Sequence, residues 1–198
     1  MTQIALFGTS ADPPTAGHQA IISWLGQHFD RVAVWAADNP MKLQQTSLRH
    51  RSAMLQVLIE DIGDAQGNIH LYPELSSPWT LITLERARQK WPGAEFTLVI
   101  GADLVKQLPF WRQAQTLLKQ VQLLVVPRPG YQLEADDLME LRKLGARVAI
   151  AALTGPAISS TAYRQDRDVD VLTPAIQAYI HREQLYACQE NSKKRLLI

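Results

Sequence analysis

The chain has 198 residues, of which 46% are hydrophobic and 20% are charged, and its formal net charge is +1. This length and composition allow a full hydrophobic core, in one large domain or a small pair. The even charge balance argues against bulk nucleic-acid binding, which usually shows as a basic patch, and leaves room for a local phosphate site.

Apolar runs typical of strands alternate with amphipathic stretches typical of helices along the whole chain. The pattern predicts strands at 3–8, 31–37, 68–72, 95–101, 121–127 and 146–153, and helices at 17–28, 47–63, 80–91, 134–145, 159–167 and 174–185. Such alternation predicts an α/β fold, a Rossmann-like doubly wound parallel sheet with helices on both faces. The near-continuous apolar run at 97–100 fits a strand at the sheet centre.

No repeat, low-complexity segment or clear linker divides the chain, so we expect a single domain over 1–187, followed by a flexible tail at 188–198. The only cysteine, Cys188, permits no internal disulfide. No leader pattern and no apolar stretch of about 20 residues is present, so we expect a cytoplasmic protein without a membrane or nucleic-acid partner. The sequence leaves a homo-oligomer possible.

The first unusual loop, "FGTSADPPTAGH" at 7–18, links the first strand to the first helix. In open sheets of this class, ligands bind beyond the carboxyl ends of the strands. Gly8 permits close backbone approach, and a helix start near Thr15 offers backbone N–H groups to an anion. Thr15 and His18 are three residues apart, on one helical face, so both can reach one phosphate. The alternative is a helix-capping threonine beside a buried histidine.

The second unusual loop, "GPAISSTAYR" at 155–164, has a similar character. Ser160 and Thr161 offer hydroxyl groups at a helix start, and Arg164 follows on the same face. Hydroxyls and a guanidinium together suit a polyphosphate. The alternative is an ordinary helix cap beside a solvated arginine.

Together, "FGTSADPPTAGH" and "ISSTAYR" resemble the signatures of the nucleotidylyltransferase superfamily. The segments "NPMK", "RSAML", "GADLVKQLPFW", "RPGY" and "YIHREQLY" are similar to those of bacterial nicotinate-nucleotide adenylyltransferases, over roughly residues 3–187. The resemblance implies transfer of an adenylyl group from ATP to nicotinate mononucleotide, with release of pyrophosphate. The attacking phosphate is already an anion, so catalysis becomes positioning and charge stabilisation.

The resemblance also assigns roles to particular residues. It implies His18, Thr15 and Lys42 as catalytic, with Arg51 supporting them less directly. It implies that the ATP phosphates contact Gly8, Thr9, Gly17, Ser160, Thr161 and Arg164, and that the acceptor contacts Asp103, Trp111, Trp79, Thr80 and Arg128. Mg²⁺ is expected to be carried by the ATP phosphates, with no metal ligands from the protein.

Two departures from the family pattern bear on substrate choice. Thr15 occupies a slot where these relatives carry histidine, as in the pantetheine-phosphate adenylyltransferase branch, and "SSPWT" replaces a longer family segment. The sequence therefore leaves two alternatives. The acceptor is nicotinamide mononucleotide or phosphopantetheine, or the protein is a nucleotide-binding module that has lost catalysis. The "SSPWT" loop carries no acidic residue and precedes a helix start, so it favours the acid over the amide.

Overall fold

The computed structural model describes residues 1–39, 42, 46–63, 66–153 and 158–186. Its centre is a six-stranded, fully parallel sheet in the order β3-β2-β1-β4-β5-β6. The strands are β1 (Gln3–Thr9), β2 (Arg31–Ala36), β3 (Ile69–Leu71), β4 (Glu95–Gly101), β5 (Gln122–Val126) and β6 (Arg147–Ile150). The order reverses between β1 and β4, and such a switch point opens a crevice at the carboxyl edge of a parallel sheet.

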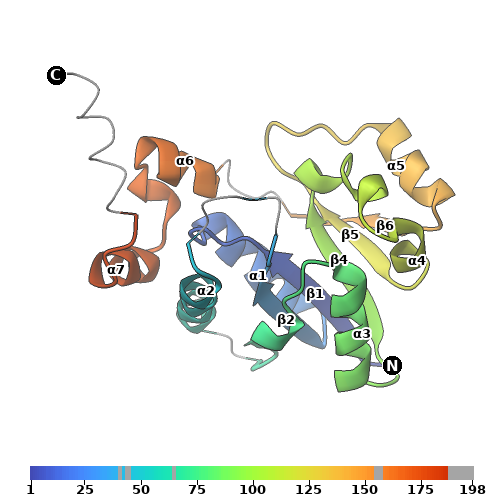
Figure 1. Ribbon diagram of the computed structural model, residues 1–198, viewed down its shortest axis with the longest axis horizontal. Helices are drawn as coiled ribbons and strands as arrows, with labels where there is room; N and C mark the ends of the chain where they lie inside the picture. The colour runs from blue at the N-terminus through green and yellow to red at the C-terminus, as the bar shows by residue number, and fades with distance from the viewer. Residues whose placement is uncertain (40–41, 43–45, 64–65, 154–157, 187–198) are drawn as a thin grey trace.

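Helices cover both faces of this sheet, and Figure 1 shows them in two groups. One group is α1 (Ala16–His28), α2 (Leu48–Ile62), α6 (Ser160–Asp166) and α7 (Pro174–Arg182); the other is α3 (Thr80–Lys90), α4 (Ala114–Leu118) and α5 (Ala135–Lys143). Single 3₁₀ turns lie at η1 (Pro73–Leu75), η2 (Ala102–Leu104), η3 (Leu108–Phe110) and η4 (Val169–Val171).

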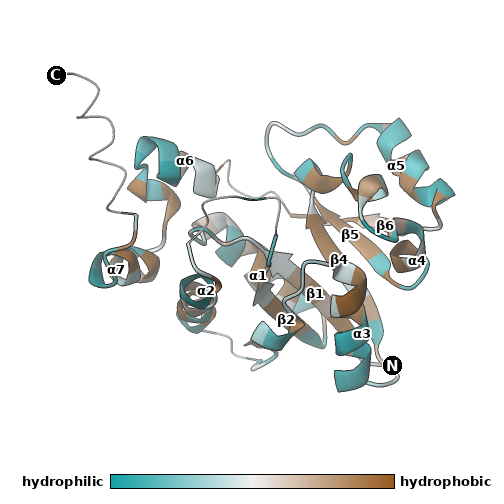
Figure 2. Cartoon of the chain, viewed as in Figure 1, coloured by the Kyte–Doolittle hydropathy of each residue, from teal (hydrophilic) through white to brown (hydrophobic). Residues whose placement is uncertain are grey.

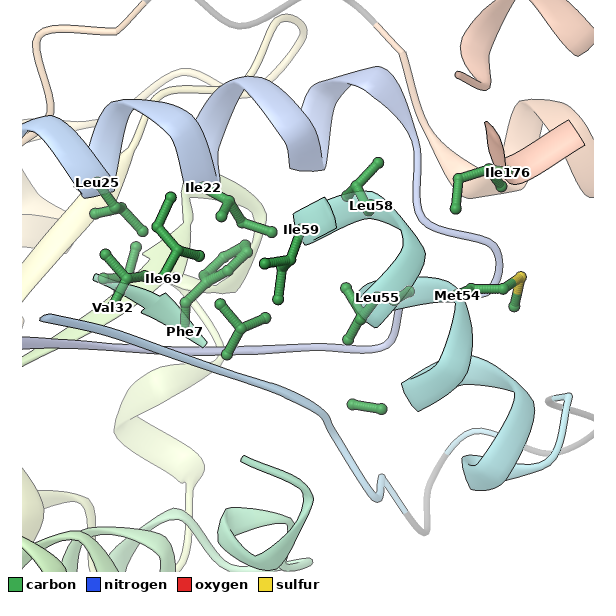
Figure 3. Packing of buried hydrophobic residues seen from close by; sticks show 14 of the residues in the cluster. Phe7, Ile22, Leu25, Val32, Met54, Leu55, Leu58, Ile59, Ile69 and Ile176 are labelled. Atoms are coloured by element: carbon green, nitrogen blue, oxygen red, sulfur yellow. The ribbon is translucent and has the colours of Figure 1, made fainter. Parts of the chain in front are cut away.

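Alternating strand residues supply two separate cores. On β1, Phe7 joins the cluster under α1, α2 and α7, whereas Leu6 joins the cluster under α3, α4 and α5. This follows from the two-residue period of a strand, whose successive side chains point to opposite faces. The strands are accordingly mostly brown in Figure 2, and Figure 3 shows Phe7 and Val32 against Ile22, Leu25 and Ile59 of the first cluster.

The predicted fold class is confirmed, and the errors lie at element ends. The strand predicted at 146–153 stops at Ile150, where its pairing with Val125 ends. Ile150 is 51% exposed, so its apolar character did not indicate burial in a strand. The short α4 and the 3₁₀ turns were not predicted, because three to five residues are too few to show a helical period.

Some predictions cannot be compared with the fold. Cys188, the tail at 188–198, and Gly155 and Pro156 lie outside the described residues, and the single-domain assignment stays a prediction. Among the helices of the described residues, none combines the length and the apolar character that crossing a membrane requires.

Candidate functional site

The loops that follow β1, β2, β4 and β5 bring the predicted site residues to the carboxyl edge of the sheet. His18 comes from the first turn of α1, Lys42 from the loop after β2, Asp103 from η2 and Arg128 from the loop after β5. Arg128, Asp103 and Lys42 all perturb the pKa of His18, so their charges lie within electrostatic range of its ring. The fold thus gathers residues that are up to 110 positions apart in the sequence.

The imidazole of His18 is held at both nitrogens. Its Nδ1 accepts from the backbone N–H of Thr15 at 3.1 Å and lies 2.9 Å from the Thr15 hydroxyl, while Nε2 lies 2.9 Å from the Thr9 hydroxyl. A backbone amide can only donate, so Nδ1 must be unprotonated and the neutral ring carries its proton on Nε2. Thr15, which is 1% exposed, caps α1 and forms a capping box with His18. The two sequence interpretations of Thr15 therefore describe one arrangement, in which the cap also orients the imidazole.

The surroundings of His18 favour the neutral ring. Burial, followed by the nearby Arg128 guanidinium, lowers the pKa of His18 to about 4. Both causes penalise an added positive charge. His18 is therefore a neutral hydrogen-bond donor through Nε2 near pH 7.

Lys42 adds a mobile positive charge next to this donor. Its Nζ donates to the Ser10 hydroxyl at 2.9 Å, which ties the loop after β2 to the loop after β1. Burial and the charge of Arg164 lower the pKa of Lys42, so the two cations lie within range of each other. Neighbouring cations that repel one another form a region ready for a multiply charged anion.

Arg51 of α2 links the same two loops through hydrogen bonds. Its guanidinium, 3% exposed, donates to the backbone carbonyls of Ser10, Ala37 and Thr46 at 2.8 to 3.0 Å. Each of these three hydrogen bonds ends on a backbone carbonyl of the two loops. This agrees with the less direct role that the family resemblance implies for it.

The start of α6 docks on the loop after β1. The Ser160 hydroxyl donates to the carbonyl of Pro13 at 2.7 Å, and Arg164 donates to the carbonyl of Asp12. Arg164 also lies 3.3 Å from the hydroxyl of Thr161. These contacts bring the second unusual loop against the first, so both face the same edge of the sheet.

Glycines 8 and 17 allow close packing within this region. A Cβ on Gly8 would lie 2.5 Å from ring carbons of Trp35, and a Cβ on Gly17 would lie 3.3 Å from Ile158. Packing against the buried indole of Trp35 is therefore sufficient to explain the glycine at position 8, without a contact to a ligand. Thr9, the next residue, is the partner of His18 already described.

The acceptor side of the site contains an ion pair and a cleft. Arg128 contacts the Asp103 carboxylate at 3.1 Å, and its guanidinium lies 5.7 Å from the ring centre of Tyr131. A cleft of about 890 Å³ opens beside this pair, and Asp103, Lys106, Gln107, Arg128, Tyr131 and Glu134 are among its lining residues. Such a volume is in the range of small-molecule sites.

The remaining predicted residues, Trp111, Trp79 and Thr80, lie on nearby loops. Trp111 is partly buried against the core under α3 to α5. This position is compatible with a packing role and with the predicted stacking on the pyridine ring of the acceptor. Trp79 is 40% exposed and immediately precedes Thr80, the first residue of α3. The Arg112 guanidinium lies 4.8 Å over the Trp79 ring, a cation–π contact that brings positive charge to this loop.

Comparison with known proteins agrees with this geometry. A model of the cytidylyltransferase-like family matches residues 6–166, which run from β1 to the end of α6. The chain belongs to the cytidylyltransferase-like family. A Synechocystis protein named "Probable nicotinate-nucleotide adenylyltransferase" is 46% identical to this family member, covering 93% of the present chain and 98% of its own. A Bacillus pumilus protein of the same name is 29% identical, over 94% and 99% of the two chains.

Solved structures of the family show the same fold. The Plasmodium falciparum nicotinic acid mononucleotide adenylyltransferase complexed with NaAD superposes with a TM-score of 0.81 at 19% identity, over 94% of this chain and 98% of that one. The solved structure supports the fold, and the family model with the 46% identical relative confirms the predicted resemblance to nicotinate-nucleotide adenylyltransferases.

Sequence reasoning missed several residues of this family member's site. Asp12 is 3% exposed and accepts from the Tyr186 hydroxyl at 2.7 Å, and the backbone N–H of Thr46 lies 3.4 Å from its other oxygen. Ser10 and Arg112 are further examples. A signal for Asp12 existed, since an aspartate before two prolines in a ligand loop is unusual. Tyr186 ends the family-like segment "YIHREQLY", but that segment did not indicate its contact with Asp12, which depends on the tertiary structure.

The described residues fit a magnesium ion that arrives on ATP. They contain no group of three or more His, Cys, Asp or Glu side chains placed to hold a metal. Two acids of this region are already engaged, Asp12 by Tyr186 and Asp103 by Arg128. The source of Mg²⁺ stays a prediction.

Proposed function

We propose that this protein transfers the adenylyl group of ATP to nicotinate mononucleotide, giving the deamido dinucleotide of the NAD pathway and pyrophosphate. The observation that carries the proposal is the fixed Nε2–H donor of His18, set among Lys42, Arg164 and Arg128 at the switch point of the sheet. The names of the relatives support it.

The reaction exchanges one phosphorus–oxygen bond for another. An oxygen of the acceptor's phosphate attacks the α-phosphorus of ATP, and the bond from that phosphorus to the bridging oxygen breaks, so that pyrophosphate leaves with the electron pair. Negative charge grows on the α-phosphate oxygens meanwhile, and the His18 Nε2–H donates a hydrogen bond to them. Thr15 holds Nδ1, so the ring keeps its orientation. The Nε2–H exchanges its contact with the Thr9 hydroxyl for one with a phosphate oxygen.

Two cationic side chains neutralise the negative charge on the other phosphates of ATP. Lys42 and Arg164 bind the β- and γ-phosphates and stabilise the leaving pyrophosphate, while Thr161, beside Arg164, adds a hydroxyl. Ser160 acts through the loop that it ties to Pro13. Mg²⁺, carried on the ATP phosphates, supplies further neutralisation of the same charge.

The acceptor occupies the region around Asp103 and Arg128. Arg128 pairs with the mononucleotide phosphate, and Asp103 binds the ribose hydroxyls once its guanidinium partner turns to that phosphate. The pyridine ring lies near Trp111 and Trp79, where the Arg112 charge and the N-terminal amides of α3 at Thr80 favour a carboxylate over an amide.

Product analysis tests the proposal. Purified protein is incubated with MgATP and nicotinate mononucleotide, nicotinamide mononucleotide or phosphopantetheine, and pyrophosphate release and products are followed by chromatography. We expect the deamido dinucleotide to exceed the amide product about ten- to hundredfold in kcat/KM. Equal use of both pyridine substrates contradicts the acid-selective pocket alone. ATP binding without pyrophosphate release from any acceptor contradicts the enzyme assignment.

Two further expectations belong to this proposal. A cytoplasmic location fits an enzyme that uses ATP and a mononucleotide. A homo-oligomer remains a prediction, to be measured by light scattering.

A further inference from the structure

We propose that Tyr186, at the end of the described chain, is a positioning residue for the ATP phosphate site. It does not touch the substrate in this proposal; it acts by fixing Asp12 in the loop after β1. The proposal rests on the proposed function for its meaning in catalysis, and its main test does not require turnover.

The first step concerns the contact itself. The Tyr186 hydroxyl donates to Asp12 Oδ1 at 2.7 Å, across 174 positions of sequence. Asp12 is 3% exposed, so water has little access to this carboxylate. A buried carboxylate depends on its hydrogen-bond donors, and loss of one leaves an oxygen poorly satisfied.

The second step concerns what Asp12 holds. Its other oxygen lies 3.4 Å from the backbone N–H of Thr46, in the loop that follows β2. Its backbone carbonyl accepts from Arg164 of α6. Asp12 therefore joins the loop that ends at His18, the loop that carries Lys42, and the arginine predicted to bind ATP.

The third step concerns how Tyr186 is itself held. Its ring packs edge-on against Tyr163 of α6, with centroids 5.5 Å apart and an interplanar angle of 83°. Arg167, the residue after α6, donates to the backbone carbonyl of Tyr186. These two contacts hold the ring and the backbone of Tyr186 against α6, so the position of its hydroxyl is fixed relative to α6.

Burial raises the pKa of Tyr186, and the adjacent Asp12 charge raises it further. The phenol consequently keeps its proton throughout the working pH range and remains a donor to the carboxylate. Tyr186→Phe removes the hydroxyl with its contacts to Asp12 and to the Thr46 side chain, while the ring contact with Tyr163 stays. The double-mutant cycle with Asp12→Asn identifies the part that acts through Asp12.

The chain offers two matched controls for this substitution. Tyr163→Phe makes the same change in the neighbouring ring, whose hydroxyl makes no hydrogen bond to another residue in the described part of the chain. Tyr179→Phe removes a hydroxyl that contacts His50 of α2 at 3.1 Å, away from the loop after β1. Together they separate the loss of any buried tyrosine hydroxyl from loss of this one.

The main measurement is binding of MgATP by calorimetry, at a temperature where circular dichroism shows each variant folded. Losing one hydrogen bond to a charged group typically shifts an equilibrium about tenfold. We expect Tyr186→Phe to weaken ATP binding about five- to twentyfold and the two controls to stay within about twofold of the wild type. In steady-state kinetics we expect KM for ATP to rise while KM for the acceptor stays within about twofold.

A double-mutant cycle with Asp12→Asn tests the route of the effect. If Tyr186 acts through Asp12, adding Tyr186→Phe to Asp12→Asn changes ATP affinity less than twofold. The proposal is overturned by wild-type ATP affinity in Tyr186→Phe, by equal weakening in Tyr163→Phe, or by a full Tyr186→Phe effect in the Asp12→Asn background. If Asp12→Asn does not fold, the comparison of Tyr186→Phe with Tyr163→Phe decides.

These outcomes are distinct from failure of the proposed function. A wild type that binds ATP but releases no pyrophosphate contradicts the adenylyl-transfer proposal, and the ATP titrations still test Tyr186.

Discussion

Replacing Thr15 with valine tests how His18 is oriented. Valine keeps the shape of threonine and removes the hydroxyl that lies 2.9 Å from His18 Nδ1. The backbone N–H of Thr15 still donates to the same nitrogen at 3.1 Å, so the tautomer with its proton on Nε2 is retained. His18 Nδ1 therefore loses one of its two hydrogen-bond donors. The Nε2–H that donates to the α-phosphate remains, but the imidazole ring is less restricted in orientation.

The expected size follows from one hydrogen bond. A net contribution of about 0.5–1.5 kcal/mol corresponds to a loss of about two- to thirteenfold in kcat. Removal of the helix cap independently lowers the free energy of unfolding by about 1 kcal/mol. Thr173→Val is the control, because Thr173 is also a buried threonine at the N-cap of a helix, where its hydroxyl accepts from the backbone N–H of Ile176.

The assay is pyrophosphate release at saturating ATP and acceptor, with the free energy of unfolding measured by urea for both variants. We expect both to lose stability and only Thr15→Val to lose kcat. A kcat loss above about a hundredfold means that Thr15 itself contacts the reacting phosphate. An unchanged kcat means that the cap does not orient the imidazole, and refutes the reasoning.

His18→Ala removes the proposed α-phosphate donor, so we expect kcat to fall about 10²–10³-fold with little change in KM; a loss under about fivefold removes His18 from that role. The pKa of His18, near 4 when folded, lies below its unfolded value, so the unfolded chain binds more protons between about pH 4 and 6.5. This group's contribution to stability is therefore complete above about pH 6.5 and is lost as the pH falls toward 4; an NMR titration of the His18 ring checks it, and a midpoint near 6.5 contradicts it. Arg164→Ala removes a cation and its bond to the Asp12 carbonyl, so we expect weaker ATP and pyrophosphate binding by calorimetry, and unchanged affinities return Arg164 to a structural role. Gly8→Ala places a Cβ 2.5 Å from the Trp35 ring, and we expect a loss of about 1–3 kcal/mol in unfolding experiments, partly recovered in a Gly8→Ala/Trp35→Phe double variant; a full-stability Gly8→Ala protein contradicts the packing argument.

The sequence was sufficient for the parts of this protein that depend on local pattern. Strand and helix alternation predicted the parallel sheet, and the two unusual loops predicted which edge carries the site. His18 and Arg164 were predicted because each lies where a loop of unusual composition leads into a helix, whereas Lys42 was implied by the family resemblance; their roles stay predictions.

The parts that could not be predicted depend on contacts between distant segments. Tyr186 closes the family-like segment "YIHREQLY", yet nothing in that segment indicates Asp12 as the partner of its hydroxyl. Ser160 has the side chain of a phosphate ligand, yet its hydroxyl bonds to the carbonyl of Pro13. Local composition indicates which groups a residue offers, and only the tertiary structure decides which partner takes them.

The docking of α6 on the loop after β1 has a consequence for biogenesis. Pro13 and Ser160 are 147 positions apart, and Asp12 and Tyr186 are 174 apart. During synthesis the residues of the first loop leave the ribosome first and have to wait for almost the whole chain before these partners exist. The nascent chain can complete β1, α1 and β2 early, but its phosphate-facing surface is assembled among the last contacts to form. Incomplete chains released before α6 lack Tyr186, which donates to the buried carboxylate of Asp12, and we therefore expect quality-control proteases to degrade them.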